Sequence, residues 1–104
     1  MESNTRRVEF DALLRQVSQI PHIYFQPPSN IKLQYPCIIY KREEIRNRQA
    51  DNSVYNQQRF YQVTVIDSNP DSIYVDRVSK MVNCDHARTF MTEGLNHDVF
   101  RIYY

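Results

Sequence analysis

The sequence predicts one α+β domain over residues 1–104, with a mostly antiparallel sheet, two helices packed on one face and a long protruding hairpin. The order of patterns along the chain is helix, strand, hairpin, helix, hairpin, which is typical of helices that cover one face of an antiparallel sheet. A long hydrophilic reversal, RNRQADNSVYNQQR, separates the strand-like segments YPCIIYKREEI and FYQVTVID. No internal repeat, low-complexity tract or linker divides the chain.

The first element is an amphipathic helix. Four apolar residues recur at the spacing i, i+3, i+4 and i+7, which forms one stripe of a helix: Phe10, Leu13, Leu14 and Val17. We take Thr5 as the N-cap. Pro21 ends the helix near Gln19, because the residue before a proline avoids helical angles.

A short strand over 22–26 and a loop over 27–30 lead to the hairpin. Its first arm is expected from Tyr35 to Ile45, with Cys37, Ile39 and Lys41 on one face and Ile38 and Tyr40 on the other. The pattern then becomes charged, and we place the turn at Asp51-Asn52, whose side chains tolerate left-handed angles. The returning arm runs from Arg59 to Asp67 and shows clear period-two alternation: Tyr61, Val63 and Val65 against Phe60, Thr64 and Ile66.

The second helix has a start signal, with Asn69 as N-cap, Pro70 at the first helical position and Asp71 in the first turn. It is expected to end near Asn83, with four residues on its apolar face: Tyr74, Val78, Met81 and Val82. A final pair of strands is expected over 88–92 and 99–104. The turn between them is expected to contain Glu93, Gly94, Leu95 and Asn96. In the second strand, Phe100, Ile102 and Tyr104 are expected to share one face.

The composition excludes several classes of protein. Gly94 is the only glycine among 104 residues, so phosphate-binding loops, dinucleotide fingerprints and nucleophile elbows are absent. The net charge is +1, which argues against tight sequence-independent DNA binding. No apolar run is long enough to span a membrane, and the N-terminus lacks a secretory signal core. Cys37 and Cys84 form no CxxC pair and are expected as reduced thiols of a cytosolic protein.

Two groups of residues are candidates for chemical sites. Cys84, Asp85 and His86 with His97 and Asp98 could hold zinc, but capping at a helix end and turn explains these residue types better. Glu43 and Glu44 are adjacent on a strand, so they are expected on opposite faces and cannot act as a carboxylate pair. We therefore expect no catalytic residue, no metal site and no cofactor.

The hairpin carries a basic zone interrupted by acids: Arg42, Arg46, Arg48 and Arg59 with Glu43, Glu44 and Asp51. This mixture is typical of a solvated or intersubunit surface. A nucleic-acid site is the alternative, with tyrosines that stack on bases; strand tyrosines fill cores and interfaces more often.

Four motifs together resemble a family of small neck proteins from long-tailed, siphovirus-like bacteriophages: YPCIIYKREEI, ADN followed by a tyrosine and YQVTVID, NPDS, and LNHDVFRIYY. Members are described as tail terminator, minor capsid or head-tail connector proteins. The resemblance covers residues 35–104. The first 34 residues match only as an amphipathic helix, and residues 83–88 depart from the family pattern.

The resemblance implies a tail-terminator-like domain without catalytic activity. It forms a ring, commonly a hexamer, on the finished tail tube, ends tube polymerisation and offers a head-joining surface. The implied partners are further copies of the chain, the tail tube protein and a head-completion or connector protein; genomic DNA passes through without specific binding, and no membrane is involved. Such a virion protein is assembled in the host cytoplasm.

The hairpin is expected to contact the tube or a neighbouring subunit through six residues: Arg42, Arg46, Arg48, Asp51, Tyr55 and Arg59. Strands over 35–45, 59–67 and 99–104 are expected to offer edges that a neighbouring copy covers. One alternative is a head-completion or adaptor protein on the portal side. Another, of a different class, is a small nucleic-acid-binding protein.

Overall fold

The computed structural model describes the backbone of residues 2–50 and 53–104 and the side chains of residues 6–47 and 57–104. Its elements, in chain order, are α1 (Glu2–Ser18), β1 (His22–Phe25), β2 (Cys37–Ala50), β3 (Ser53–Asp67), α2 (Ile73–Ser79), β4 (Cys84–Thr92) and β5 (Leu95–Tyr103). The predicted order of helices and strands is confirmed.

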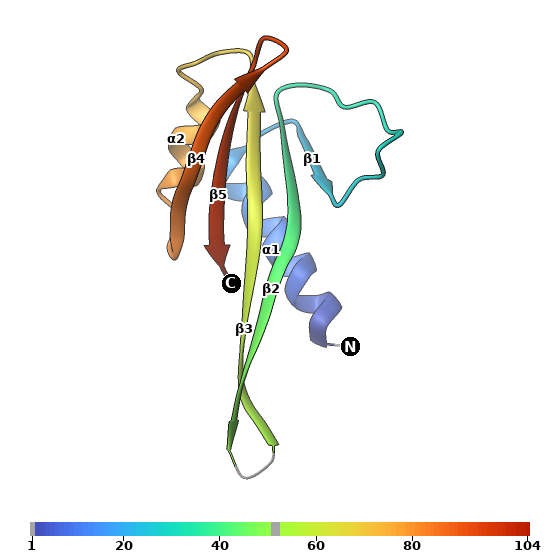
Figure 1. The fold of residues 1–104 in the computed structure, drawn as a ribbon, viewed down its shortest axis with the longest axis vertical. Coiled ribbons are helices and arrows are strands. Elements are labelled where there is room, and N and C mark those ends of the chain that lie inside the picture. Colours follow the sequence, from blue (N-terminus) through green and yellow to red (C-terminus); the bar gives the residue numbers. More distant parts are fainter. Residues whose placement is uncertain (1, 51–52) are drawn as a thin grey trace.

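The strands form a five-stranded sheet in the order β1-β2-β3-β5-β4. β1 pairs with β2 in parallel, and the other three pairings are antiparallel. Both helices lie behind the sheet in the view of Figure 1, and the β2–β3 hairpin extends far below it. The α+β class, with a mostly antiparallel sheet, is therefore confirmed.

The core lies between the helices and one face of the sheet. Phe10 of α1 stacks on Tyr61 of β3 with ring centroids 4.4 Å apart, and it also contacts Tyr40 at 5.6 Å and Tyr104 at 5.3 Å. The other buried members of this cluster are Leu14, Ile20, Ile38, Val63, Val65, Val78, Phe100 and Ile102. The predicted alternation of the hairpin is thus confirmed, because residues from the same predicted face of each arm meet in the core.

Helix α1 matches the predicted stripe but not the predicted start. It begins at Glu2, so Thr5 lies inside the helix and the N-cap prediction is wrong. The helix ends at Ser18, whose hydroxyl donates to the Leu14 carbonyl at 2.6 Å. Gln19 then adopts a left-handed φ of 56°, which ends the helix just before Pro21.

Helix α2 begins later and ends earlier than predicted. Ser72 is the N-cap, and its hydroxyl accepts a hydrogen bond from the Tyr74 N–H at 3.2 Å. Asn69 instead accepts from the Asp71 N–H at 2.9 Å, which makes a turn before the helix. Because α2 ends at Ser79, Val82 lies beyond the helix and is 82% exposed, which contradicts its predicted place on the apolar face.

The β4–β5 hairpin is longer than predicted because its turn is shorter. Only Glu93 and Gly94 connect the strands, both with positive φ, 53° and 75°. Two left-handed residues are the signature of a type I′ turn, whose twist matches that of the flanking strands. Residues 83–88, where the resemblance fails, comprise Asn83, which has a left-handed φ of 61°, and the first half of β4.

The strand order corrects one expectation about edges. β2, β3 and β5 were expected to offer free edges, but within the sheet each of them lies between two neighbours. The edge strands are β1 and β4, which local sequence patterns did not identify. Edges of β2 and β3 remain free only where the hairpin extends past its neighbours.

Candidate functional site

The part of the hairpin that leaves the sheet is the candidate site, and we call it the ribbon: residues 41–50 of β2 and 53–59 of β3. β1 pairs with β2 only up to Tyr40. β5 pairs with β3 from Phe60 to Asp67 and therefore not with residues 53–59. In the described backbone, no strand pairs with either long edge of the ribbon. Past the N-terminal end of α1 the ribbon continues alone (Figure 1), which gives the molecule extents of 52 × 28 × 23 Å.

A β-bulge marks the point where the ribbon begins. Arg42 pairs with Tyr61 and Glu44 pairs with Phe60, which leaves Glu43 as an extra residue. An extra residue shifts the alternation of the strand. Glu43 and Glu44 therefore converge on Arg101 of β5, at 3.1 and 2.8 Å, and the prediction that they occupy opposite faces is wrong.

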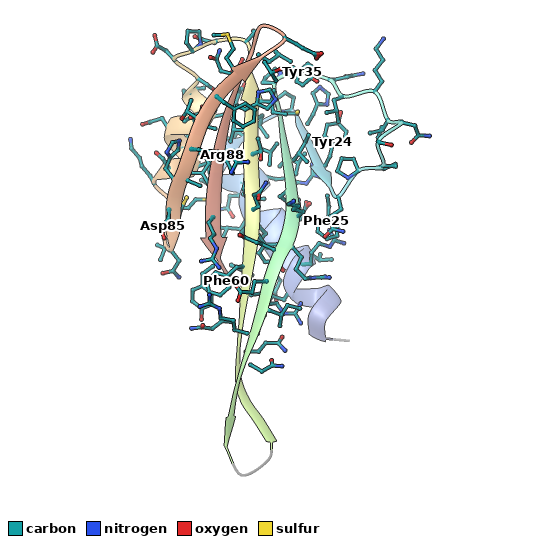
Figure 2. The ribbon with its side chains drawn as sticks, viewed as in Figure 1. Tyr24, Phe25, Tyr35, Phe60, Asp85 and Arg88 are labelled. Carbon is teal, nitrogen blue, oxygen red and sulfur yellow. The ribbon has the colours of Figure 1, made fainter. Side chains whose placement is uncertain are left out.

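Arg46 and Phe60 complete a group that we call the base cluster (Glu43, Glu44, Arg46, Phe60 and Arg101). Arg46 binds Glu44 at 2.6 Å, and this hydrogen bond lowers the pKa of the Glu44 carboxyl. The guanidinium groups of Arg46 and Arg101 lie 5.0 and 4.1 Å from the Phe60 ring centroid. Figure 2 shows Phe60 low on the sheet, where the ribbon emerges. The Phe60 ring and the paired charges thus connect the start of the ribbon to β5.

Helix α1 supports the opposite face of the ribbon. Arg6 donates to the Gln57 carbonyl at 3.3 Å, and the Gln57 side chain donates to Asn47 across the hairpin at 2.9 Å. Further into the sheet, Tyr40 donates to Asp11 at 2.6 Å. Burial raises the pKa of the Tyr40 hydroxyl to about 12, and the bond to Asp11 adds to the rise. The ribbon therefore has a braced root, by which we mean that α1 and the base cluster both contact the residues where the ribbon leaves the sheet.

The predicted contact residues divide into three groups. Arg42 and Arg46 are exposed on the ribbon, although Arg46 is paired with Glu44. Arg59 is only 6% exposed; its Nε donates to Gln57 at 2.9 Å, and its buried Nη1 has no partner among the described residues. Asp51 and the side chains of Arg48 and Tyr55 lie outside the described residues. Arg101 and Phe60 were missed because only the strand register brings them together.

The residues of the candidate zinc site are split between the two faces of the sheet. His86 lies 3.2 Å from Asp98 and 2.9 Å from Thr89, while His97 stacks on Phe90 with ring centroids 4.7 Å apart. Burial raises the pKa of the Cys84 thiol to about 11, with Asp85 adding to the rise. In the described part of the chain, no group of three or more His, Cys, Asp or Glu side chains is placed to hold a metal ion.

Among the described helices, neither is long and apolar enough to cross a membrane. No model of a known protein family matches the chain, and no curated protein or solved structure is significantly similar to it. A function for this chain is therefore argued from its own residues and geometry.

Proposed function

We propose that this chain is a structural virion protein of a bacteriophage neck, with no catalytic role. Copies of it form a ring on the end of the tail tube, stop further tube subunits from adding, and present the surface to which the head binds. The proposal includes its partners, which are further copies of the chain, the tail tube protein and a head-completion or connector protein. Assembly takes place in the host cytoplasm.

The ribbon is the observation that carries this proposal. Where the ribbon starts, the Arg42 N–H donates to the Gln26 side chain and the Arg59 carbonyl accepts from the Tyr104 N–H. Beyond these contacts, no strand of the described chain pairs with either edge of the ribbon. Such edges are sites at which another chain can add a strand. A monomeric protein gains nothing in stability from a long bare hairpin, since a two-stranded ribbon is marginal in water by itself. A ring that repeats one heterologous contact would give each ribbon a partner.

The braced root of the ribbon also supports an assembly role. The base cluster on one face and Arg6 of α1 on the other hold the ribbon at a fixed angle to the sheet. A contact element that is already oriented loses less conformational freedom when it binds. The four sequence motifs that resemble the phage neck family include both arms of this hairpin.

The nucleic-acid alternative has less support from the ribbon's charges. Arg46 is paired with Glu44, Arg101 is paired with both glutamates, and Arg59 is buried. Phosphate binding needs free cations, and it produces a steep fall of affinity with salt. The head-completion alternative uses the same ribbon against the portal side. Imaging particles that carry only tails, or only heads, separates that role from the proposed one.

Shortening the ribbon tests the proposal. Residues 47–57 are replaced by Asn-Gly, because Arg46 and Gln58 are register partners and this dipeptide favours a two-residue hairpin turn. The replacement leaves the sheet and its core residues unchanged but removes Gln57, which accepts a hydrogen bond from the buried Arg59. Circular dichroism therefore first checks that the variant folds. We expect it to lose binding to the end of the tail tube in electron micrographs, and phage that carry it to make tails of abnormal length.

The matched control is Ile73→Ser, which changes a 53% exposed residue at the start of α2, away from the ribbon. This variant should cap tubes as the unchanged protein does. Normal tail length and normal titre with the shortened ribbon would contradict the proposed function.

A further inference from the structure

A groove lies at the end of the sheet from which the ribbon emerges. It has a volume of about 630 Å³, within the range of roughly 300–1,000 Å³ in which proteins hold ligands. It is bounded by the second half of α1, the end of α2, the entry to β4 and the last residues of β5. The lining residues that matter below are Leu13, Val17, Lys80, Met81 and Val82.

The groove is apolar, and two basic residues, Lys80 and Arg77, lie at its rim beside one acid, Asp76, which leaves the rim with a net positive charge. Val82 is 82% exposed beside it, while Met81 packs partly against the core. Lys80 stands at the rim, and its ammonium group lies 3.0 Å from Asp76, with both side chains largely exposed. Arg77, on the same turn, donates to the Ser18 carbonyl at 2.9 Å. The groove therefore suits an apolar side chain that is followed by an acid.

The β4–β5 turn, at the opposite end of the same strands, has that composition. Phe90 and Met91 are 39% and 66% exposed, and Glu93 follows them. Glu93 occupies a left-handed position that an asparagine or glycine fills more easily. The turn itself does not favour a glutamate here, so the choice of residue needs a reason outside the turn.

We propose that the β4–β5 turn of a second copy of this chain docks in the groove, with Met91 against Val82 and Leu13, and with Glu93 facing Lys80. This inference rests on the proposed function, because it names a contact that would build the ring. The contact joins different surfaces of the two copies, so it is heterologous and closes into a ring if its rotation permits.

The direction of the ribbon agrees with this contact. β4 starts beside the groove and ends at the turn, and the ribbon leaves the sheet at the groove end (Figure 1). A copy that places its turn in the groove therefore lies alongside the ribbon of the first copy. One docking event would cover the groove and bring a second chain to the ribbon's free edge.

Self-association of the full chain tests this contact, measured by sedimentation equilibrium over a range of concentrations. Met91→Asp and Val82→Asp should each weaken association about tenfold or more, because each removes an apolar contact worth that factor. The control is Ile73→Asp, a change of the same kind at a 53% exposed residue at the other end of α2, and it should leave association unchanged.

A charge exchange makes the test specific to the two surfaces. Glu93→Lys and Lys80→Glu should each weaken association, and the double variant should recover most of the loss. A Met91→Cys protein mixed with a Val82→Cys protein should form a disulfide-linked dimer under mild oxidation, which the unchanged protein does not form.

The possible outcomes separate this inference from the proposed function. Association that none of these variants alters would overturn the groove contact and leave the ring proposal standing. A chain that stays monomeric at every concentration and on the tail tube would overturn both. Binding of a small apolar molecule in the groove, with self-association unchanged by Val82→Asp, would also overturn the contact.

Discussion

The body of the sheet and the ribbon are made from the same two strands, yet they are stabilised in different ways. In the body, β2 and β3 have a strand on each outer side and helices over one face, and they bury Ile38, Tyr40, Tyr61, Val63 and Val65. In the described part of the ribbon, β2 and β3 pair only with each other. Their described side chains are mostly polar and charged, and the contacts at the root are exposed ion pairs and cation–ring pairs.

The difference shows which part of the chain supplies stability and which part is available for partners. Burial of apolar area stabilises the body without help from another chain. Exposed ion pairs contribute little, so the ribbon adds little to the stability of the monomer. A long strand pair that contributes so little to the monomer is consistent with selection for contacts between chains.

The largest expected effect concerns the body. Phe10→Ala removes a fully buried ring that contacts Tyr40, Tyr61 and Tyr104. It should lower the free energy of unfolding by about 3–5 kcal/mol, measured by urea denaturation followed by circular dichroism. Val8→Ala, at a 53% exposed position of the same helix, should change it by no more than about 0.5 kcal/mol. Similar effects from the two variants would contradict the proposed position of the core.

An intermediate effect is expected at the border between body and ribbon. Tyr40→Phe removes the hydroxyl that donates to Asp11 and should cost about 1.5–3 kcal/mol at pH 7. The folded state raises the pKa of this hydroxyl to about 12, from 10. Its stabilising contribution is therefore complete below pH 10 and is lost as the pH rises towards 12.

The Phe variant should show a smaller fall in stability between pH 10 and 12 than the unchanged protein. Denaturation curves across that window provide the measurement. Equal slopes for the two proteins would show that the hydroxyl has no raised pKa in the folded state. The buried Cys37 thiol, whose pKa burial raises to about 11, is present in both proteins and cancels from the comparison.

The smallest effect on global stability is expected at the base cluster. Arg101→Ala removes two exposed ion pairs and one cation–ring contact, and should cost only about 0.5–1 kcal/mol. Its local effect should be larger, because amides of the ribbon should exchange hydrogen faster while those of the body do not. Arg88→Ala, which removes an exposed arginine from β4 on the same sheet, is the control. Faster exchange throughout the body would mean that the ribbon is not a separate unit.

The sequence predicted the features that depend on local periodicity. The alternation of Tyr61, Val63 and Val65 and the stripe of α1 follow from one residue and its near neighbours, so both were confirmed. The start of α2 was wrong because Asn69 and Ser72 both carry oxygens that cap a helix, and only the course of the chain decides between them. The fold class was confirmed because it depends on the order of patterns rather than on their boundaries.

The candidate site was less predictable because it depends on register and strand order. The bulge at Glu43 reverses the faces that residues 44–47 of β2 occupy, and no local sequence pattern indicates it. Arg101 joins the base cluster through the β3–β5 register. The strand order placed the free edges in β1, β4 and the ribbon, rather than along all of β2, β3 and β5. Each of these features depends on residues that are distant in the sequence.

The proposed function requires that the ribbon serves to bind other chains. Hydrogen exchange tests this most directly, measured on the full chain alone at low concentration and again when it is bound to the tail tube protein. We expect the amides of residues 41–50 and 53–59 to exchange faster than those of the body in the isolated protein and to become at least tenfold slower in the complex. The amides of the body should change little. Ribbon amides that exchange as slowly as those of the body in the isolated protein, or that exchange no more slowly in the complex, would contradict the account.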